Sequence, residues 1–267
     1  MKRLALASAL LASCAHAEPI PLAPLALPGT LLSLEAEAGE DAGELPRLAP
    51  LALEALGPLE RWGGLKFPTR IVVLPNHEAL ETRTKHSGFG WLRAWARFDV
   101  VYLQSPRSWG FGASPSLPEL RDLLTHELAH CAMYQELSDG SDWAHKEIPL
   151  WFREGFASWT SKQGGKRLTP EALALTLRAR RDLDPLGNAE ALYRADEPVV
   201  YAAAHWAFAA LEQLGDDKIL ALLATVRRGW SFPVAFAQVY GEDSATFEAR
   251  TLTALREPGS PSPETTP

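Results

Sequence analysis

A pair of histidines four residues apart, with a glutamate directly after the first, is the part of this sequence best suited to chemistry. His126, Glu127 and His130 read His-Glu-Leu-Ala-His inside an apolar run over 117–137. In a helix, positions four apart share a face, so both imidazoles can bind one metal ion. The carboxylate of Glu127 can then take a proton from water on that ion. The motif predicts a ligand pair together with a general base.

An alternative without metal remains open, because the pattern is short. With seven histidines in 267 residues, it arises by chance in roughly one such chain per hundred. In that alternative both histidines are ordinary helix residues and Glu127 is a solvated charge.

The surroundings of the motif favour a buried helix over 117–137. One apolar face consists of Leu117, Leu120, Leu124, Leu128 and Cys131. A second apolar side surrounds the histidines and consists of Leu123, Met133, Tyr134 and Leu137. We therefore expect this helix to be covered on two sides, by a sheet and by other helices. Buried histidine nitrogens need partners, and a metal ion is one.

A third ligand is predicted at Glu154, a lone carboxylate in an aromatic segment 24 positions after His130. Pro149 can open a helix there, and Gly155 lets another backbone approach closely. Two histidines and one glutamate leave a fourth position open, as in catalytic zinc sites. This ligand set favours zinc, although other divalent ions also accept nitrogen and oxygen ligands. In the alternative, Glu154 only stabilises a helix N-terminus.

With both motifs in place, the chain resembles the gluzincin metallopeptidases, and among them the bacterial peptidase MA-like group. That group follows HExxH with a W-x-x-E-G-x-A segment, which here is Trp151 to Ala157. The resemblance covers about Thr30 to Arg256. It implies a zinc-dependent peptidase, by default an endopeptidase, that acts on peptides or proteins with Glu127 as general base. It also implies an α+β, zincin-like fold with a small N-terminal mixed sheet, an active-site helix and a mainly helical C-terminal half.

Two rival ligand sets are disfavoured by the sequence. A metzincin needs glycine and histidine at the positions where Met133 and Glu136 stand. His145 lies in a polar loop over 138–147 and reads as a solvated loop residue.

A peptidase of this kind needs a side chain that donates a hydrogen bond to the oxygen on which negative charge develops, the oxyanion. We expect this donor in a predicted helix over 199–214. Tyr201 and His205 are four apart there, and the resemblance implies that one of them has this role, with Tyr201 favoured. Both can instead fill the core as packed side chains. Gluzincins often place an acid four residues after the ligand glutamate; here Ser158 stands at that position, so the partners that orient the histidines stay unassigned.

The remaining elements are read from periodicity and from start and stop signals. Strands are predicted over Thr30–Glu37, Arg70–Leu74 and Arg97–Gln104. Helices are predicted over Leu48–Trp62, His77–Thr84, Asp216–Arg228, from Thr169-Pro170-Glu171 and from Ser244. By resemblance, the strand over Arg97–Gln104 is the edge strand that receives an extended peptide beside the active-site helix.

The ends of the chain read as segments outside the folded domain. Residues 1–17 form a signal peptide, or 1–13 a lipoprotein signal that leaves Cys14 lipidated, so we expect an exported protein that is periplasmic, secreted or lipid-anchored. Residues 18–29 are a Pro/Ala-rich leader, 30–257 one catalytic domain and 258–267 a disordered tail. Cys131 is then the one remaining thiol, so no intramolecular disulfide is expected.

Composition limits the classes of partner. The net charge is −7 and Lys and Arg form no cluster beyond short runs, which argues against nucleic-acid binding. A lipid anchor at Cys14 is the one predicted contact with a membrane. Two other functions stay open: a catalytically inactive exported zinc-binding or interaction domain of the cell envelope, and a structural protein without metal.

Overall fold

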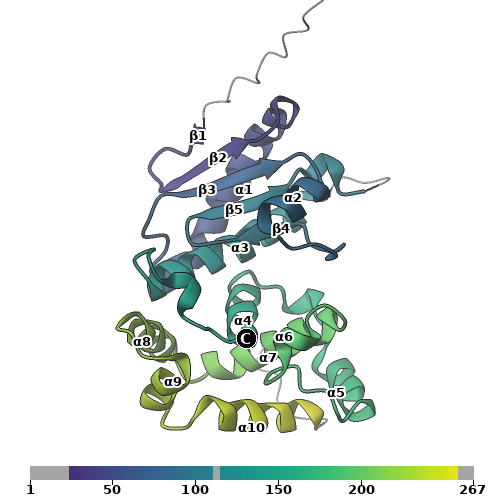
Figure 1. The fold of residues 1–267 in the computed structure, drawn as a ribbon, viewed down its shortest axis with the longest axis vertical. Coiled ribbons are helices and arrows are strands. Elements are labelled where there is room, and N and C mark those ends of the chain that lie inside the picture. Colours follow the sequence, from purple (N-terminus) through teal and green to yellow (C-terminus); the bar gives the residue numbers. More distant parts are fainter. Residues whose placement is uncertain (1–23, 111–114, 258–267) are drawn as a thin grey trace, which may run out of the picture.

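The computed structural model describes residues 24–110 and 115–257, and its fold is α+β, as the sequence predicted. A sheet flanked by helices forms one half of the molecule and a group of helices forms the other (Figure 1). The predicted signal peptide, Cys14 and the C-terminal tail lie outside the described residues. Within the described ranges, no helix has the length and apolar character needed to cross a membrane.

The sheet has five strands in the order β1-β2-β3-β5-β4. Their bounds are β1 Leu25–Ala26, β2 Leu32–Ala36, β3 Thr69–Leu74, β4 Ala94–Ala96 and β5 Val100–Gln104. The three central strands β2, β3 and β5 are parallel, and β1 and β4 add antiparallel edges. In the register Ile71 pairs with Leu34 on one side and Val101 on the other.

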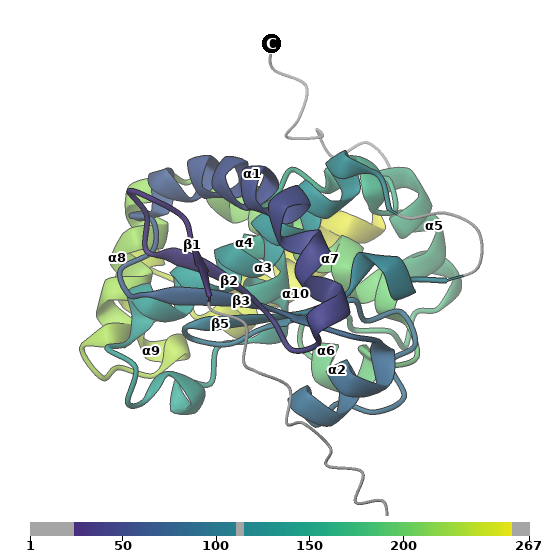
Figure 2. The same ribbon diagram turned by 90° about the horizontal axis from the view of Figure 1, so that it is seen from above.

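Alternation along β3 gives the sheet two apolar faces, because successive side chains point in opposite directions. Ile71 and Val73 pack into the core beneath α1 (Leu45–Leu56) and α3 (Leu117–Leu137). Val72 and Leu74 pack on the opposite face with Leu80 of α2 (His77–Thr84). Seen from above, α1 and α2 lie on opposite sides of the strands (Figure 2).

Helix α3 lies between the two halves and has the predicted bounds. Its first turn is closed by a capping box, in which Ser116 accepts from the Glu119 backbone N–H and Glu119 bonds back to Ser116. Leu124 and Leu128 pack toward the sheet, whereas Met133 belongs to the core of the helical half. The two-sided burial is therefore confirmed, except that Leu117 is 49% exposed.

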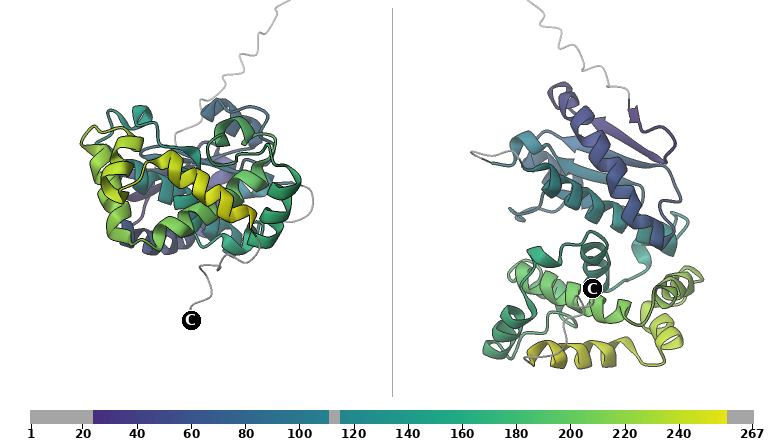
Figure 3. Two further views of the ribbon diagram at one scale, coloured as in Figure 1. Left: turned by 90° about the horizontal axis from the view of Figure 1, so that it is seen from below. Right: turned by 180° about the vertical axis from the view of Figure 1, so that it is seen from behind.

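The helical half is built around α4 and α7, which make the most extensive contact between helices. The helices of this half are α4 Leu150–Thr160, α5 Pro170–Ala179, α6 Ala189–Leu192, α7 Glu197–Glu212, α8 Asp216–Arg227, α9 Phe232–Tyr240 and α10 Ser244–Arg256. Helix α10 crosses the side away from the sheet and contacts α5, α7 and α9 (Figure 3). Short 3-10 helices occupy Gly39–Glu44, Gly57–Trp62, Pro106–Ser108, Trp143–His145 and Gly164–Lys166.

Three sequence predictions need correction. The strand over 97–104 begins only at Val100 and is internal, since the edge beside α3 is the short strand β4. The leader over 18–29 was predicted to be loose, but its residues Leu25–Ala26 pair with β2 and belong to the sheet. The helix over 48–62 begins at Leu45 and ends as an α-helix at Leu56, after which the chain tightens into a 3-10 turn.

Candidate metal centre and active site

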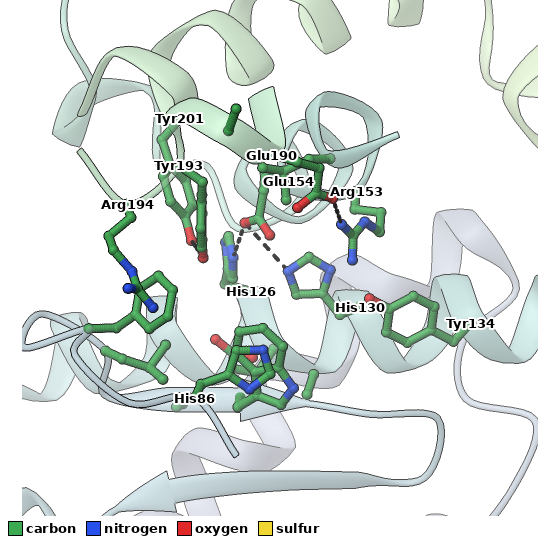
Figure 4. A pocket seen from close by; sticks show the side chains of 18 residues that line it. His86, His126, His130, Tyr134, Arg153, Glu154, Glu190, Tyr193, Arg194 and Tyr201 are labelled. Atoms are coloured by element: carbon green, nitrogen blue, oxygen red, sulfur yellow. Dashed lines mark hydrogen bonds and ion pairs between the residues drawn. The ribbon is translucent and has the colours of Figure 1, made fainter. Parts of the chain in front are cut away.

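Two consecutive helices bring the three predicted ligands together. His126 and His130 lie one turn apart on α3, and Glu154 lies in the first half of α4. Glu154 Oε2 is 3.4 Å from His126 Nε2 and 3.7 Å from His130 Nε2. Figure 4 shows the carboxylate above the two rings, with all three side chains facing one point. Among the described residues, this is the one group of its kind that could hold a metal ion.

The distances fit a metal site better than they fit hydrogen bonds. Ligand atoms at ~2.1 Å from a tetrahedral ion are roughly 3.4 Å apart, whereas N–H···O hydrogen bonds are about 2.9 Å long. Glu154 Oε2 is buried and has no hydrogen-bond partner within the described ranges. A buried carboxylate oxygen in this position is costly unless a cation meets it. The residues present therefore fit a divalent ion.

Burial also sets the protonation of the ligands in the form that binds metal. Burial lowers the pKa of His126 to about 4, so its imidazole is neutral at pH 7. Burial alone would raise the pKa of Glu154, but the neighbouring imidazoles hold that pKa well below its usual value. A neutral histidine and an ionised glutamate are the states needed for coordination.

Glu127 lies between the ligand histidines in sequence and lines the same cavity. Its side chain is buried, and the backbone of Ala96 in β4 hydrogen-bonds to its carboxylate. Burial raises the pKa of Glu127 to about 7. A carboxylate with a pKa near neutral can both accept and return a proton in one reaction cycle.

The atoms that usually orient ligand histidines have no partner here. Nδ1 of His126 and Nδ1 of His130 are buried and make no hydrogen bond to any residue in 24–110 or 115–257. Ser158 occupies the position at which gluzincins often have an acid, and its Oγ is 3.0 Å from Nδ1 of His205. Ser158 therefore joins α4 to α7 and does not orient the ligand histidines.

A cavity of about 510 Å³ opens onto the ligand group. Besides the ligands and Glu127 it is lined by His86, Phe89, Leu92, Ala94, Trp95, Ala96, Tyr134, Leu150, Arg153, Glu190, Ala191, Tyr193, Arg194 and Tyr201. A second cavity of about 210 Å³ shares Ala94, Glu127 and Tyr201 with the first and extends along α3 toward Glu119. The two together form a groove that passes the ligand group.

The two predicted oxyanion donors lie in different surroundings. Tyr201 lines both cavities, and its hydroxyl is 2.9 Å from the hydroxyl of Tyr193. Arg167 lies over the Tyr201 ring, with Cζ 4.5 Å from the centroid. His205 is fully buried and is not among the residues that line either cavity. Of the two, Tyr201 is the one that the structure brings to the ligand group.

The backbone of β4 forms one wall of the groove. Arg97 N–H donates to Val100 and Gln104 N–H donates to Arg93, so in the antiparallel pairing Arg93, Trp95 and Arg97 use their polar groups within the sheet. The N–H and C=O of Ala94 and Ala96 consequently point away from β5, toward the free edge. Both alanines line the large cavity.

Several residues of the site carry no clear signal in the sequence. Tyr193 and Arg153 line the cavity, but nothing in their spacing marks them. His145, which the sequence assigned to a solvated loop, is exposed and lies outside the ligand group.

Comparison with known proteins assigns this chain to no family. No protein-family model matches the chain, and no curated protein matches it in sequence.

Proposed function

We propose that this protein is a zinc-dependent peptidase of the gluzincin type, with a zincin-like arrangement of sheet edge and active-site helix. The observation that carries the proposal is the convergence of His126, His130 and Glu154 on one point, with Glu127 beside them in a groove. Three ligands leave one coordination position for water and substrate, as a catalytic site requires. A cavity of about 510 Å³ is within the size of ordinary substrate sites.

The protein residues have separate roles in this proposal. Zinc, when bound by the three ligands, lowers the pKa of water and polarises the carbonyl of the scissile bond. Glu127 accepts the proton of the attacking water and passes it to the leaving amine. The Tyr201 hydroxyl donates a hydrogen bond to the oxygen on which negative charge develops.

The free edge of β4 can set the direction in which a substrate peptide lies. An extended peptide can pair with the N–H and C=O groups of Ala94 and with the C=O of Ala96, and so lie along the groove past the ligand group. Ala96 N–H already bonds the Glu127 carboxylate, which fixes the base beside the position of the peptide.

The experiment that tests the proposal measures zinc and peptide hydrolysis on the same purified protein. We expect about one zinc per chain by elemental analysis, much weaker binding in Glu154→Ala, and chelator-sensitive cleavage of an unfolded protein substrate. The exposed Glu171 of α5 gives a control, Glu171→Gln, which keeps both properties. Absence of stoichiometric zinc after zinc addition and dialysis would refute the proposal.

A second candidate is the zinc-binding domain without turnover. One observation favours it: the Nδ1 atoms of His126 and His130 make no hydrogen bond to other described residues, and such bonds normally tune a catalytic metal. Stoichiometric zinc with no Glu127-dependent hydrolysis of any peptide would select this candidate.

A further inference from the structure

An arginine next to the ligand glutamate has unused hydrogen-bonding capacity inside the cavity. Arg153 precedes Glu154 on α4 and lines the cavity. Its Nη2 donates to Glu190 Oε1 at 2.6 Å, while its Nε is buried and has no hydrogen-bond partner among the described residues. A guanidinium carries five N–H donors in a planar fork. The hydrogen bond to one carboxylate oxygen, together with the approach of the Tyr134 hydroxyl, leaves part of that fork unfilled.

A tyrosine faces this arginine from α3. Tyr134 lies one turn after His130, and its ring is stacked on the imidazole of His130 with the centroids 6.1 Å apart. Tyr134 and Arg153 line the same cavity. Figure 4 shows Arg153 between His130 and Tyr134, on the opposite side of the ligand group from Tyr193 and Tyr201. Leu150 lines the same cavity, so the positive end of the α4 dipole adds to the field there.

The present partner of Arg153 is held loosely. Glu190 belongs to the four-residue helix α6, and its side chain is 72% exposed, compared with 25% for Arg153. An ion pair with one partner in water exchanges readily for another carboxylate. Glu190 can therefore leave the guanidinium without exposing a buried charge of its own.

We infer that Arg153 and Tyr134 bind a carboxylate of the peptide substrate, which replaces Glu190 on the guanidinium. The planar fork of arginine matches a carboxylate through two parallel hydrogen bonds, and a tyrosine hydroxyl can add a third. The inference rests on the proposed function and gives it a substrate class, peptides that present a carboxylate to Arg153. The carboxylate can come from an Asp or Glu side chain or from the C-terminus of the peptide.

The first experiment measures binding in the absence of turnover. The zinc-loaded Glu127→Gln protein is titrated with eight-residue peptides in which one Glu, or in a matched set one Gln, is moved through a neutral sequence. Each peptide is made with a C-terminal acid and with a C-terminal amide. One charge-assisted hydrogen-bond pair corresponds to about tenfold in affinity. A preference for Glu at one position identifies the side chain, and a preference for acid over amide identifies the C-terminus.

Variants then assign the preference to Arg153. In the same Glu127→Gln background, Arg153→Met should abolish the tenfold preference, whereas Arg178→Met, at an exposed arginine of α5, should retain it. Glu190→Gln should tighten the binding of the preferred peptide, because the competing carboxylate is gone. A preference that survives Arg153→Met, or weaker binding in Glu190→Gln, would overturn the inference. If Arg153→Met does not fold or lacks zinc, the Glu190→Gln result decides.

The inference and the proposed function can fail separately. If the wild-type protein cleaves peptides and the binding experiment finds no carboxylate preference, the inference is wrong and the peptidase stands. If peptides bind through a carboxylate on Arg153 and none is cleaved, the peptidase is wrong and the carboxylate site stands.

Discussion

At the scale of single residues, the proposed mechanism gives Glu127 a role in turnover and none in metal binding, because its carboxylate is next to the three candidate ligands and is not one of them. We expect Glu127→Gln to retain zinc and to reduce kcat by about 10²- to 10⁴-fold, the usual contribution of a general base. Elemental analysis and peptide hydrolysis on one preparation measure both quantities. Loss of zinc together with activity would instead make Glu127 a structural residue.

His205 should make the stability of the fold depend on pH in the acidic range. Burial lowers its pKa from 6.5 to about 4. Between these values the unfolded chain binds a proton that the folded protein does not, so stability is full above pH ~6.5 and falls as the pH drops toward ~4. At pH ~5 the loss is about 2 kcal/mol.

The comparison of two histidine variants isolates this effect. Urea unfolding at neutral pH and near pH 5 should show a smaller acid-induced loss of stability in His205→Gln than in the wild type. His145→Gln changes an exposed histidine at the end of the 3-10 helix Trp143–His145 and should keep the wild-type pH dependence. Equal acid-induced losses of stability in the wild type and both variants would show that His205 is not the source of the pH dependence.

At the scale of elements, the contact between α4 and α7 depends on Gly155. A Cβ added there would lie 2.4 Å from the carbonyl oxygen of Ala204 and 2.6 Å from Cβ of Phe208. We therefore expect Gly155→Ala to lower the free energy of unfolding by about 1–3 kcal/mol and to weaken zinc binding, since the adjacent residue is the ligand Glu154. Thermal unfolding and a zinc titration measure the two effects.

A matched glycine provides the control for that prediction. Gly165 has ordinary backbone geometry, and a Cβ there meets nothing within 4 Å. Gly165→Ala should leave stability and zinc binding close to wild type. A destabilisation equal to that of Gly155→Ala would show that close approach of α7 is not the cause.

How much the sequence predicted depended on whether the signal was local. The bounds of α3 and the pairing of His126 with His130 follow from one helix and its cap, so they could be read directly. Gly155 was correctly predicted to allow close approach of another backbone, although α7 could not be named as its partner. Glu154 was predicted as a ligand from its aromatic setting, and its distance from both imidazoles agrees with that prediction.

The prediction of the edge strand was wrong because a two-residue turn lies inside the stretch 97–104 that was predicted as one strand. Phe98 and Asp99 connect β4 to β5, with Arg97 N–H bonded to Val100. β4 itself is only three residues, too short for a pattern of alternation to appear. Tyr193 and Arg153 could not be predicted either, because the cavity that they line joins distant parts of the chain.

At the scale of the whole molecule, the ligand group connects the two halves. His126 and His130 belong to α3, which packs against the sheet, and Glu154 belongs to α4 in the helical half. Zinc bound only by the folded protein should therefore stabilise the complete fold. At a free zinc concentration ~100 times the Kd the gain is about 2.7 kcal/mol, or roughly 5–10 °C in Tm.

Thermal unfolding with zinc and with a chelator measures this gain. In Glu154→Ala the shift should largely disappear. A wild-type Tm that is the same under both conditions would contradict a site that joins the two halves.

The short stretch of chain between α3 and α4 has a consequence for the order of folding. Glu154 follows His130 by 24 positions and His126 by 28, so closing this loop costs less conformational entropy than pairing the distant segments of the sheet. A metal ion can thus join the two helices early and serve as a nucleus on which later elements assemble. Refolding of the wild type should then be faster when zinc is present from the start than when it is added at the end, as stopped-flow tryptophan fluorescence would record.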